Sequence, residues 1–221
     1  MPPLRTQAGL RQAFGVWGLP GALRGDNGTP WGSRGDLPTD LELWLAGLGV
    51  PIQFNPPRRP QDNGVVERSQ GTGKRWGDPP TAADAAALQV VMDQMDRRQR
   101  EQYPYDGRRS RWDCYPELRH SGRPYDTAWE QQHWSEERAY DLLANHVVER
   151  QVSRQGTVSV YNRNYYVGKA HGQRPAFVRF DPQQRRWLFA DADDHLLNHH
   201  DAPEMNAANI QGLTVTHRRN G

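Results

Sequence analysis

The segment Gly21-Ala-Leu-Arg-Gly-Asp26-Asn-Gly28 predicts a short strand that ends in a turn, and Val50-Pro-Ile-Gln-Phe54 predicts a second strand. Between them, apolar residues recur at positions 41, 44, 45 and 48, which is the spacing of one helix face, with Thr39 or Asp40 as its cap. A proline-rich loop follows the second strand, and a further helix is expected from Gly64 to about position 76. This order of elements predicts an α/β fold.

Asp26 follows the first predicted strand, and Glu67 lies in the first turns of the later helix, 41 positions further along the chain. Two carboxylates on rigid elements, together with a third, can hold two Mg²⁺ ions roughly 3.5 to 4 Å apart. One ion activates a water or a 3′-hydroxyl, and the other stabilises the leaving oxygen of a phosphodiester. Taken alone, Asp-Asn-Gly is typical of a simple turn, so the weight of this pair depends on the sequence around it.

The surrounding sequence forms an ordered string that runs from Arg24-Gly-Asp26-Asn-Gly28 through Leu48–Phe54 to Asn55-Pro-Pro-Arg-Arg-Pro60-Gln-Asp-Asn-Gly-Val-Val-Glu67-Arg68 and Gly71-Thr72. It resembles the integrase catalytic core of DDE-type proteins, namely bacterial insertion-sequence transposases and retroviral integrases, over roughly residues 4–102. The resemblance implies an RNase H-like fold with Asp26 and Glu67 as the second and third catalytic, metal-binding acids. It also implies Mg²⁺ or Mn²⁺ as the cofactor.

The loop before the glutamate helix resembles the loop that family members place against substrate DNA. The candidate DNA-binding residues are polar or basic and lie around Glu67: Arg58, Arg59, Gln61, Asn63, Arg68, Lys74 and Arg75. Glu67, Gly71 and Lys74 share one face of the predicted helix, so Lys74 is expected near the acidic site and in contact with phosphate. The alternative is a solvated helix face. Gly71-Thr-Gly-Lys74 is not a nucleotide-binding loop, because Arg68 stands where its first glycine belongs.

Beyond this region, the sequence predicts a long helix from Thr81 to about Gln102 and a shorter one from about Ser135 to Leu143. Short alternating runs at 157–161, 165–167, 176–180 and 186–190 predict successive antiparallel strands. The expected architecture is an incomplete RNase H-like core followed by a linker and a small antiparallel β-barrel. Its expected parts are the partial core at 1–102, a basic aromatic linker with a helix at 103–150, the barrel at 151–200 and a flexible tail at 201–221.

Basic residues cluster in two places outside the core. From Arg97 to Arg123 there are eight arginines against four acidic residues, interleaved with Trp and Tyr, which indicates a nucleic-acid surface. The alternative is a solvated linker whose aromatic rings cover the neighbouring domain. The predicted barrel carries further charges at Arg163, Lys169, Arg174, Arg179, Arg185 and Arg186. The group His195, His199, His200 and Asp201 is interpreted as an ordinary polar tail and not as a metal site.

Composition limits the remaining classes of protein. The 221 residues carry a net charge of +2 and one cysteine, so an internal disulfide is excluded. No apolar run approaches the roughly 18 residues that span a bilayer, so a chain without a membrane partner, located in the cytoplasm, is expected. Only two of the 28 basic residues are lysines, and arginine favours bidentate contact with phosphate.

The expected function is DNA integration and transposition by Mg²⁺-dependent strand transfer, as part of a mobile element. The family's first aspartate, from an earlier strand, has no substitute, because residues 1–25 contain no Asp or Glu. We therefore expect a truncated transposase that is inactive on its own and that associates with DNA and with itself or a full-length transposase. The alternatives are a non-catalytic DNA-binding or oligomerising fragment that modulates a full-length transposase, and an unrelated β-barrel binding module.

Overall fold

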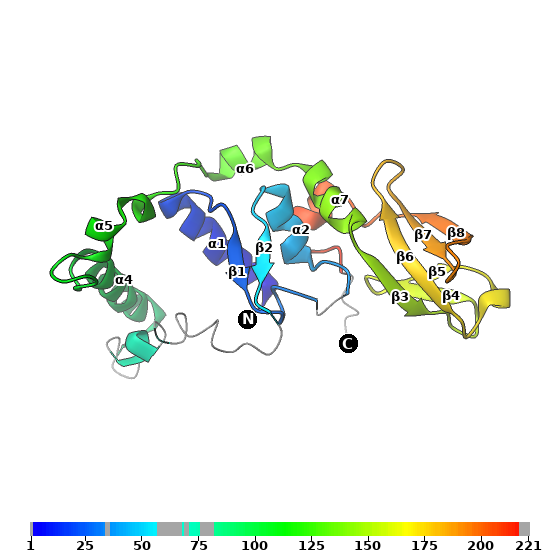
Figure 1. Cartoon of the computed structure of the whole chain (residues 1–221), viewed down its shortest axis with the longest axis horizontal. Coiled ribbons are helices and arrows are strands. Elements are labelled where there is room, and N and C mark those ends of the chain that lie inside the picture. The colour runs from blue at the N-terminus through cyan, green and yellow to red at the C-terminus, as the bar shows by residue number, and fades with distance from the viewer. Residues whose placement is uncertain (1, 34–35, 57–67, 69–70, 76–81, 217–221) are drawn as a thin grey trace. The chain divides into compact units, whose positions relative to one another are not determined.

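The computed structural model describes residues 2–33, 36–56, 68, 71–75 and 82–216 (Figure 1). The chain divides into two compact units, of which unit 1 comprises Met1–Phe54 and Pro124–Gly221 and unit 2 comprises Asn55–Arg123. Within the described ranges, every helix is too short or too polar to cross a membrane.

The first part of unit 1 is a strand–helix–strand element. It contains α1 (Pro3–Trp17), β1 (Leu23–Gly25), α2 (Asp40–Gly47) and β2 (Ile52–Phe54). The two strands are parallel, with Leu23 opposite Ile52 and Gly25 opposite Phe54. A parallel pair needs a crossover connection, which α2 and its flanking loops supply. The predicted order of elements is confirmed, but two strands do not define an RNase H-like sheet, and that part of the expectation stays a prediction.

Helix α2 is the centre of the unit 1 core. Thr39 caps it as predicted: its hydroxyl accepts from the backbone N–H of Glu42, and the Glu42 carboxylate accepts from the N–H of Thr39. The predicted apolar face is at most 1% exposed, and Leu43 on another side is also fully buried. A helix that is apolar on several sides is surrounded by protein, so α2 is covered by the helices around it.

Helices α6 (Thr127–His133) and α7 (Glu136–Ala144) belong to the same unit as α2. The carbonyl oxygen of Gly47, at the end of α2, accepts from Ser135 N and from Nε and Nη2 of Arg138. A Cβ atom on Gly47 would lie 2.1 Å from the Trp134 ring nitrogen, so only glycine permits this approach. The stretch 124–150, predicted as part of a linker, is therefore packed into the core of unit 1.

The C-terminal strands form two antiparallel sheets (Figure 1). The four-stranded sheet has the order β3 (Val147–Gln151), β6 (Pro175–Asp181), β7 (Arg186–Ala190) and β8 (Leu196–Asp201). Strands β4 (Thr157–Val160) and β5 (Arg163–Tyr166) form a hairpin whose two turn residues, Tyr161 and Asn162, have the positive φ values that a two-residue turn requires. The antiparallel strands are confirmed, while β3 and β8 were not predicted.

The expected barrel is not closed by backbone pairing among the described strands. Strands β5 and β8 are not neighbours in a ladder. Instead, Asn198 Nδ2 donates to the carbonyl oxygen of Tyr166 at 2.9 Å, and His200 Nε2 lies 2.6 Å from the same oxygen. The two sheets enclose a shared core of alternating inward residues, namely Val148, Val158, Val160, Val178, Phe180, Trp187 and Phe189. Strand β8 therefore pairs with β7 through its backbone, but it meets β5 through side chains instead of a ladder.

The segment after β8, expected to be a flexible tail, is folded through residue 216. It contains α8 (Ala207–Gln211), and Ile210 and Val215 are fully buried. Glu204 is 1% exposed and accepts hydrogen bonds from Tyr165 Oη and Trp187 Nε1, both at 2.7 Å. These contacts fix the segment against the strands, because a buried carboxylate needs its donors.

Unit 2 contains α4 (Ala85–Glu101), α5 (Arg111–Cys114) and the 3₁₀ turn η3 (Pro116–Arg119). The long helix is confirmed, and Asp84 caps it by accepting from the N–H of Ala87 at 2.8 Å. Of the described residues of α4, only Met95 is buried.

Unit 1 also contains the 3₁₀ turn η4 (Lys169–His171).

Candidate functional site

Asp26 lies immediately after β1, where the sequence placed it, and its side chain is exposed. Its Oδ1 accepts from the N–H of Gly28 at 2.9 Å, which shapes the turn. No hydrogen bond to Oδ2 occurs within the described part of the chain. A Cβ atom on Gly28 would lie 3.2 Å from Oδ1, so glycine leaves the carboxylate room. The carboxylate is therefore held in one orientation with an oxygen open to solvent.

The parallel pairing of β1 and β2 places the ends of the two strands at the same edge of the sheet. Gly25 and Phe54 are the last residues of their strands and stand opposite each other. The chain that leads to Glu67 therefore leaves the sheet at the edge where Asp26 lies. In open parallel α/β sheets, ligands bind outside the carboxyl ends of the strands.

Five of the predicted site residues lie outside the described residues, namely Arg58, Arg59, Gln61, Asn63 and Glu67. The pairing of Asp26 with Glu67 at one metal site thus stays a prediction.

The remaining predicted DNA-binding residues belong to unit 2. Residues 71–75 are helical, and the side chains of Arg68, Lys74 and Arg75 are exposed. Gly73 is buried, and a Cβ atom there would lie 3.4 Å from Met95 Cε of α4. The short helix thus contacts α4 while its basic side chains reach solvent, as phosphate contacts require.

The basic aromatic stretch of unit 2 forms a layered cluster. The guanidinium groups of Arg100 and Arg119 lie 5.9 and 5.3 Å from the Trp112 ring centroid, and that of Arg111 lies 5.5 Å from the Tyr105 ring. Tyr105 and its edge-on neighbour Tyr115 are 53% and 41% exposed. Three of the predicted basic residues are also paired with acids, in the pairs Arg97–Glu101, Arg100–Asp96 and Arg109–Asp106. The cluster therefore has exposed tyrosine rings that a ligand could contact, while part of its arginine charge is neutralised by neighbouring acids.

A buried carboxylate fixes the scaffold that carries Asp26. Glu130 of α6 is 3% exposed and accepts hydrogen bonds from Arg11 Nε and Nη2 of α1, from Trp44 Nε1 of α2 and from Tyr125 Oη. Burial alone would raise the pKa of Glu130, but the bonds from Arg11, Tyr125 and Trp44 outweigh it, and the pKa is lowered. No local pattern indicates this role, because two of the partners, Arg11 and Trp44, are distant from Glu130 in the chain.

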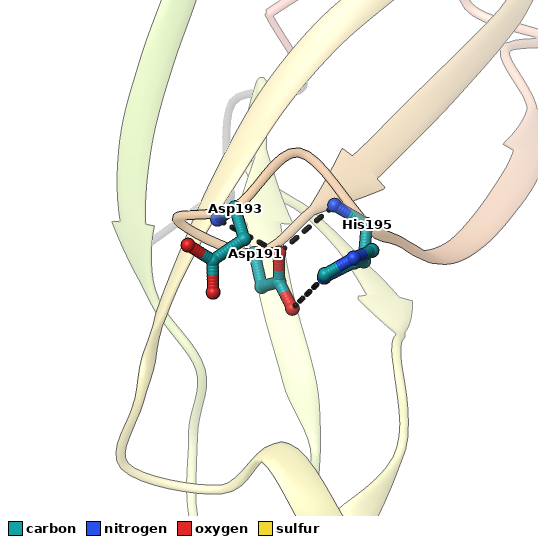
Figure 2. A group of neighbouring side chains, drawn as sticks. All are labelled: Asp191, Asp193 and His195. Carbon is teal, nitrogen blue, oxygen red and sulfur yellow. Dashed lines mark hydrogen bonds and ion pairs between the residues drawn. The ribbon is translucent and has the colours of Figure 1, made fainter.

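A second acidic group lies in the turn between β7 and β8. The ligand atoms of Asp191, Asp193 and His195 lie within 4.8 Å of one another (Figure 2). Asp191 Oδ1 accepts from the N–H groups of Asp193 and His195 at 3.0 and 2.9 Å, and these bonds, with His195 first, lower the Asp191 pKa. The carboxylate thus already stabilises its own turn, which accounts for the grouping without an ion.

The other members of the predicted polar tail belong to β8. His199, His200 and Asp201 are strand residues, and Asp201 pairs with Arg186 at 2.8 Å. The expectation that this group is not a metal site stays a prediction, and its members at positions 199–201 are part of a strand.

Comparison with solved structures gives a weak likeness to a viral integration complex. No protein-family model matches the chain. A chain of the cryo-EM structure of a simian T-cell lymphotropic virus intasome, in complex with PP2A regulatory subunit B56 gamma, is similar at 16% identity with a TM-score of 0.42. The similarity covers 89% of this chain and 61% of that chain.

Proposed function

We propose that this protein is a transposase/integrase-type protein that acts in DNA integration and transposition, with an RNase H-like core. The observation that carries the proposal is the exposed Asp26 carboxylate at the carboxyl end of β1. It is supported by the parallel β2, from whose matching end the chain continues toward Glu67. The ordered motifs around both acids resemble those of the DDE-type family.

In this proposal, the open oxygen of Asp26 and the carboxylate of Glu67 are ligands of Mg²⁺ or Mn²⁺. Hard carboxylate oxygens suit either ion. When bound, the metal would polarise the scissile phosphate and favour attack by a water or a 3′-hydroxyl. Arg68, Lys74 and Arg75, which are exposed, would hold the phosphate backbone of the DNA.

Catalysis by the 221-residue chain alone is not expected. Strand transfer of this type needs a third carboxylate, and residues 1–25 contain neither Asp nor Glu. The exposed tyrosine rings and basic side chains of unit 2 favour a second candidate function, which is a non-catalytic DNA-binding or oligomerising protein that modulates a full-length transposase. The two candidates differ in whether Asp26 and Glu67 still bind metal.

Mn²⁺ binding, followed by electron paramagnetic resonance, tests the metal site. Asp26→Asn and Glu67→Gln should each weaken Mn²⁺ binding at least tenfold, because each removes a charged ligand. Asp193→Asn removes an exposed carboxylate of the β7–β8 turn and should leave binding unchanged. Loss of binding in Asp193→Asn alone would instead assign the ion to that turn and refute the proposed site.

A strand-transfer assay with labelled duplex DNA and Mg²⁺ tests autonomous activity. We expect no joined product from the chain alone. A product that disappears in Asp26→Ala would overturn the expectation of inactivity. Salt-sensitive DNA binding by a chain that binds no Mn²⁺, unchanged in Asp26→Asn and Glu67→Gln, would favour the non-catalytic candidate.

A further inference from the structure

A cavity of about 920 Å³ lies within unit 1, and Asp26 is not among the described residues that line it. Its lining comes from parts of the chain that are distant in sequence: the start of α1, the loop that leads into α2, strands β3 and β4 with the turn after β4, and the segment after α8. Its volume falls in the range of roughly 300 to 1,000 Å³ that is typical of ligand sites. The cavity is therefore a candidate binding site that the proposed function does not use.

Side-chain hydrogen bonds tie the walls of this cavity together. Tyr161 Oη, in the turn after β4, donates to the carbonyl oxygen of Pro38 at 2.7 Å. Thr216 donates to Asp40 Oδ1 through its N–H at 3.1 Å and through its hydroxyl at 2.7 Å, which joins the segment after α8 to the first residue of α2. The walls are thus held in place before a ligand binds, which limits the entropy lost on binding.

Asp36 and Arg150 line the cavity as an ion pair. Each nitrogen of the Arg150 guanidinium donates a hydrogen bond: to Asp36 Oδ1, and to the carbonyl oxygens of Ser159 and Glu149 at 3.3 and 3.1 Å. Asp36 Oδ1 also accepts from the N–H of Leu37 at 2.6 Å, whereas Oδ2 accepts no hydrogen bond among the described residues. The Asp36 side chain is 48% exposed. The cavity therefore has a carboxylate oxygen available to a donor, while its guanidinium already has partners.

Carboxylates also make the potential in the cavity negative. Burial raises the pKa of Tyr161 well above its ordinary value, and the charges of three nearby carboxylates, with Asp40 first, raise it further. Charges that disfavour a phenolate at this place also disfavour an anionic ligand, such as a phosphate. Arg150 is the one guanidinium among the described lining residues, and it pairs with Asp36. A cationic ligand fits this arrangement.

Much of the remaining lining is apolar. Leu4 is 60% exposed, so this part of the lining is open to a ligand. A long cationic side chain buries its aliphatic stem along such a surface and keeps its charged head at a polar position. The prolines and leucines include Pro2, Pro3, Leu4, Pro30, Pro38 and Leu213.

We propose that this cavity binds a peptide segment of a partner protein in which an arginine is flanked by apolar residues. The arginine would donate to Asp36 Oδ2, since a guanidinium is a weakly hydrated cation suited to contacts between proteins. The flanking side chains would cover the prolines and leucines, and the apolar area removed from water would add affinity. A small free amine would contact Asp36 and leave this apolar lining in water, so the lining favours a peptide. The inference is independent of the proposed function, because neither metal nor DNA takes part in it.

A nuclear magnetic resonance titration of the isotope-labelled full chain tests the inference. The probe is the tripeptide acetyl-Leu-Arg-Leu-amide. A matched tripeptide has citrulline in place of arginine, which keeps the shape of the side chain but removes its charge. Agmatine, a free amine that carries a guanidinium group, is the third probe. Dissociation constants are obtained from the shifts of the amide signals of Asp36, Ser159 and Tyr161.

The arginine tripeptide should bind about three- to fivefold more tightly than the citrulline tripeptide, because the ion pair with a half-exposed carboxylate is partly screened by water. Asp36→Asn should remove this difference. Asp194→Asn, which removes the charge of an exposed pair with Arg179, should keep it. Ser159→Arg places a competing cation among the lining residues and retains both carboxylates, so it should weaken tripeptide binding at least as much as Asp36→Asn.

Equal affinity of the two tripeptides would overturn the inference, as would equal effects of Asp36→Asn and Asp194→Asn. Agmatine that binds as tightly as the arginine tripeptide would also overturn it, since the cavity would then be a site for a small amine. Thermal melting establishes that the variants are folded. If Asp36→Asn is unfolded, Ser159→Arg decides the outcome, and unchanged tripeptide binding in that variant refutes the inference.

Discussion

Removing the charge of Glu130 is the sharpest test of how unit 1 is held together. This carboxylate joins α1, α2 and α6 through Arg11, Trp44 and Tyr125, and its side chain is 4% exposed. In Glu130→Gln the side chain keeps its shape, but an amide NH₂ group, which donates hydrogen bonds, replaces one carboxylate oxygen. That amide would face donors, and the Arg11 guanidinium would lose the carboxylate with which it pairs among the described residues. The helices would then be joined by fewer and weaker bonds.

The size of the expected stability loss depends on how far Glu130 and Arg11 are exposed to solvent. Removing one member of a buried ion pair costs about 3 to 5 kcal/mol. Arg11 is 37% exposed on its side chain, so water compensates it in part, and we expect the lower end, about 3 kcal/mol. For a protein of this size that corresponds to a fall of roughly 6 to 12 °C in melting temperature.

Urea unfolding, followed by tryptophan fluorescence, measures the difference, since Trp44 contacts Glu130 directly. Asp194→Asn is the matched control, because it removes the charge of an exposed pair with Arg179 and should change little. If Glu130→Gln is no less stable than Asp194→Asn, the buried network does not hold the helices together and the reasoning is refuted.

Because the Glu130 carboxylate is buried and charged, we expect the free energy of unfolding to depend on pH. The pKa of Glu130 is lowered in the folded state, despite the opposing effect of burial, by hydrogen bonds from Arg11, Tyr125 and Trp44. Its charged form therefore stabilises the fold above the unfolded carboxyl pKa of about 4.3, and this contribution is lost as pH falls through the lower folded pKa. The difference in free energy of unfolding between wild type and Glu130→Gln should be largest near pH 7 and should decrease below about pH 4.

Three further changes test the rest of unit 1. Gly156→Ala places a Cβ atom 2.5 Å from Gly168 at a φ of +80°, and unfolding experiments should show a loss of about 2 to 3 kcal/mol, whereas Gly9→Ala, in open space within α1, should stabilise by up to about 1 kcal/mol. Thr39→Ala removes one half of the capping box of α2 and should cost about 1 kcal/mol in the same measurement. Deleting residues 202–221 removes the buried carboxylate that Trp187 contacts, so limited proteolysis should cut the C-terminal strands faster. Protection equal to that of the full chain would contradict the packing of this segment.

The elements that were predicted correctly share one property: each has a local sequence pattern that is sufficient to indicate its secondary structure. The apolar spacing of α2, its Thr39 cap and the alternation of β4, β6 and β7 are all set by neighbours within a few residues. The position of Asp26 at the end of a strand was predicted on the same basis.

The elements that were missed depend on distant partners. Strand β8 carries Asn198, His200 and Asp201, whose polarity is typical of a loop, and becomes a strand because β7 supplies a ladder. The segment after it was expected to be loose, but Glu204 is satisfied by Tyr165 and Trp187, far away in sequence. Such long-range hydrogen bonds produce no periodic pattern in the sequence.

By itself, the sequence determined the strand–helix–strand order around Asp26, the antiparallel strands near the C-terminus and the set of acidic and basic residues that chemistry can use. Only the tertiary structure decided which of these charges remain available. It pairs Arg179, Arg185 and Arg186 with carboxylates and leaves Arg154, Lys169 and Arg174 without such partners in the described residues. The physical reason is that hydropathy patterns record burial along one element, whereas the neutralisation of a charge depends on which elements meet in space.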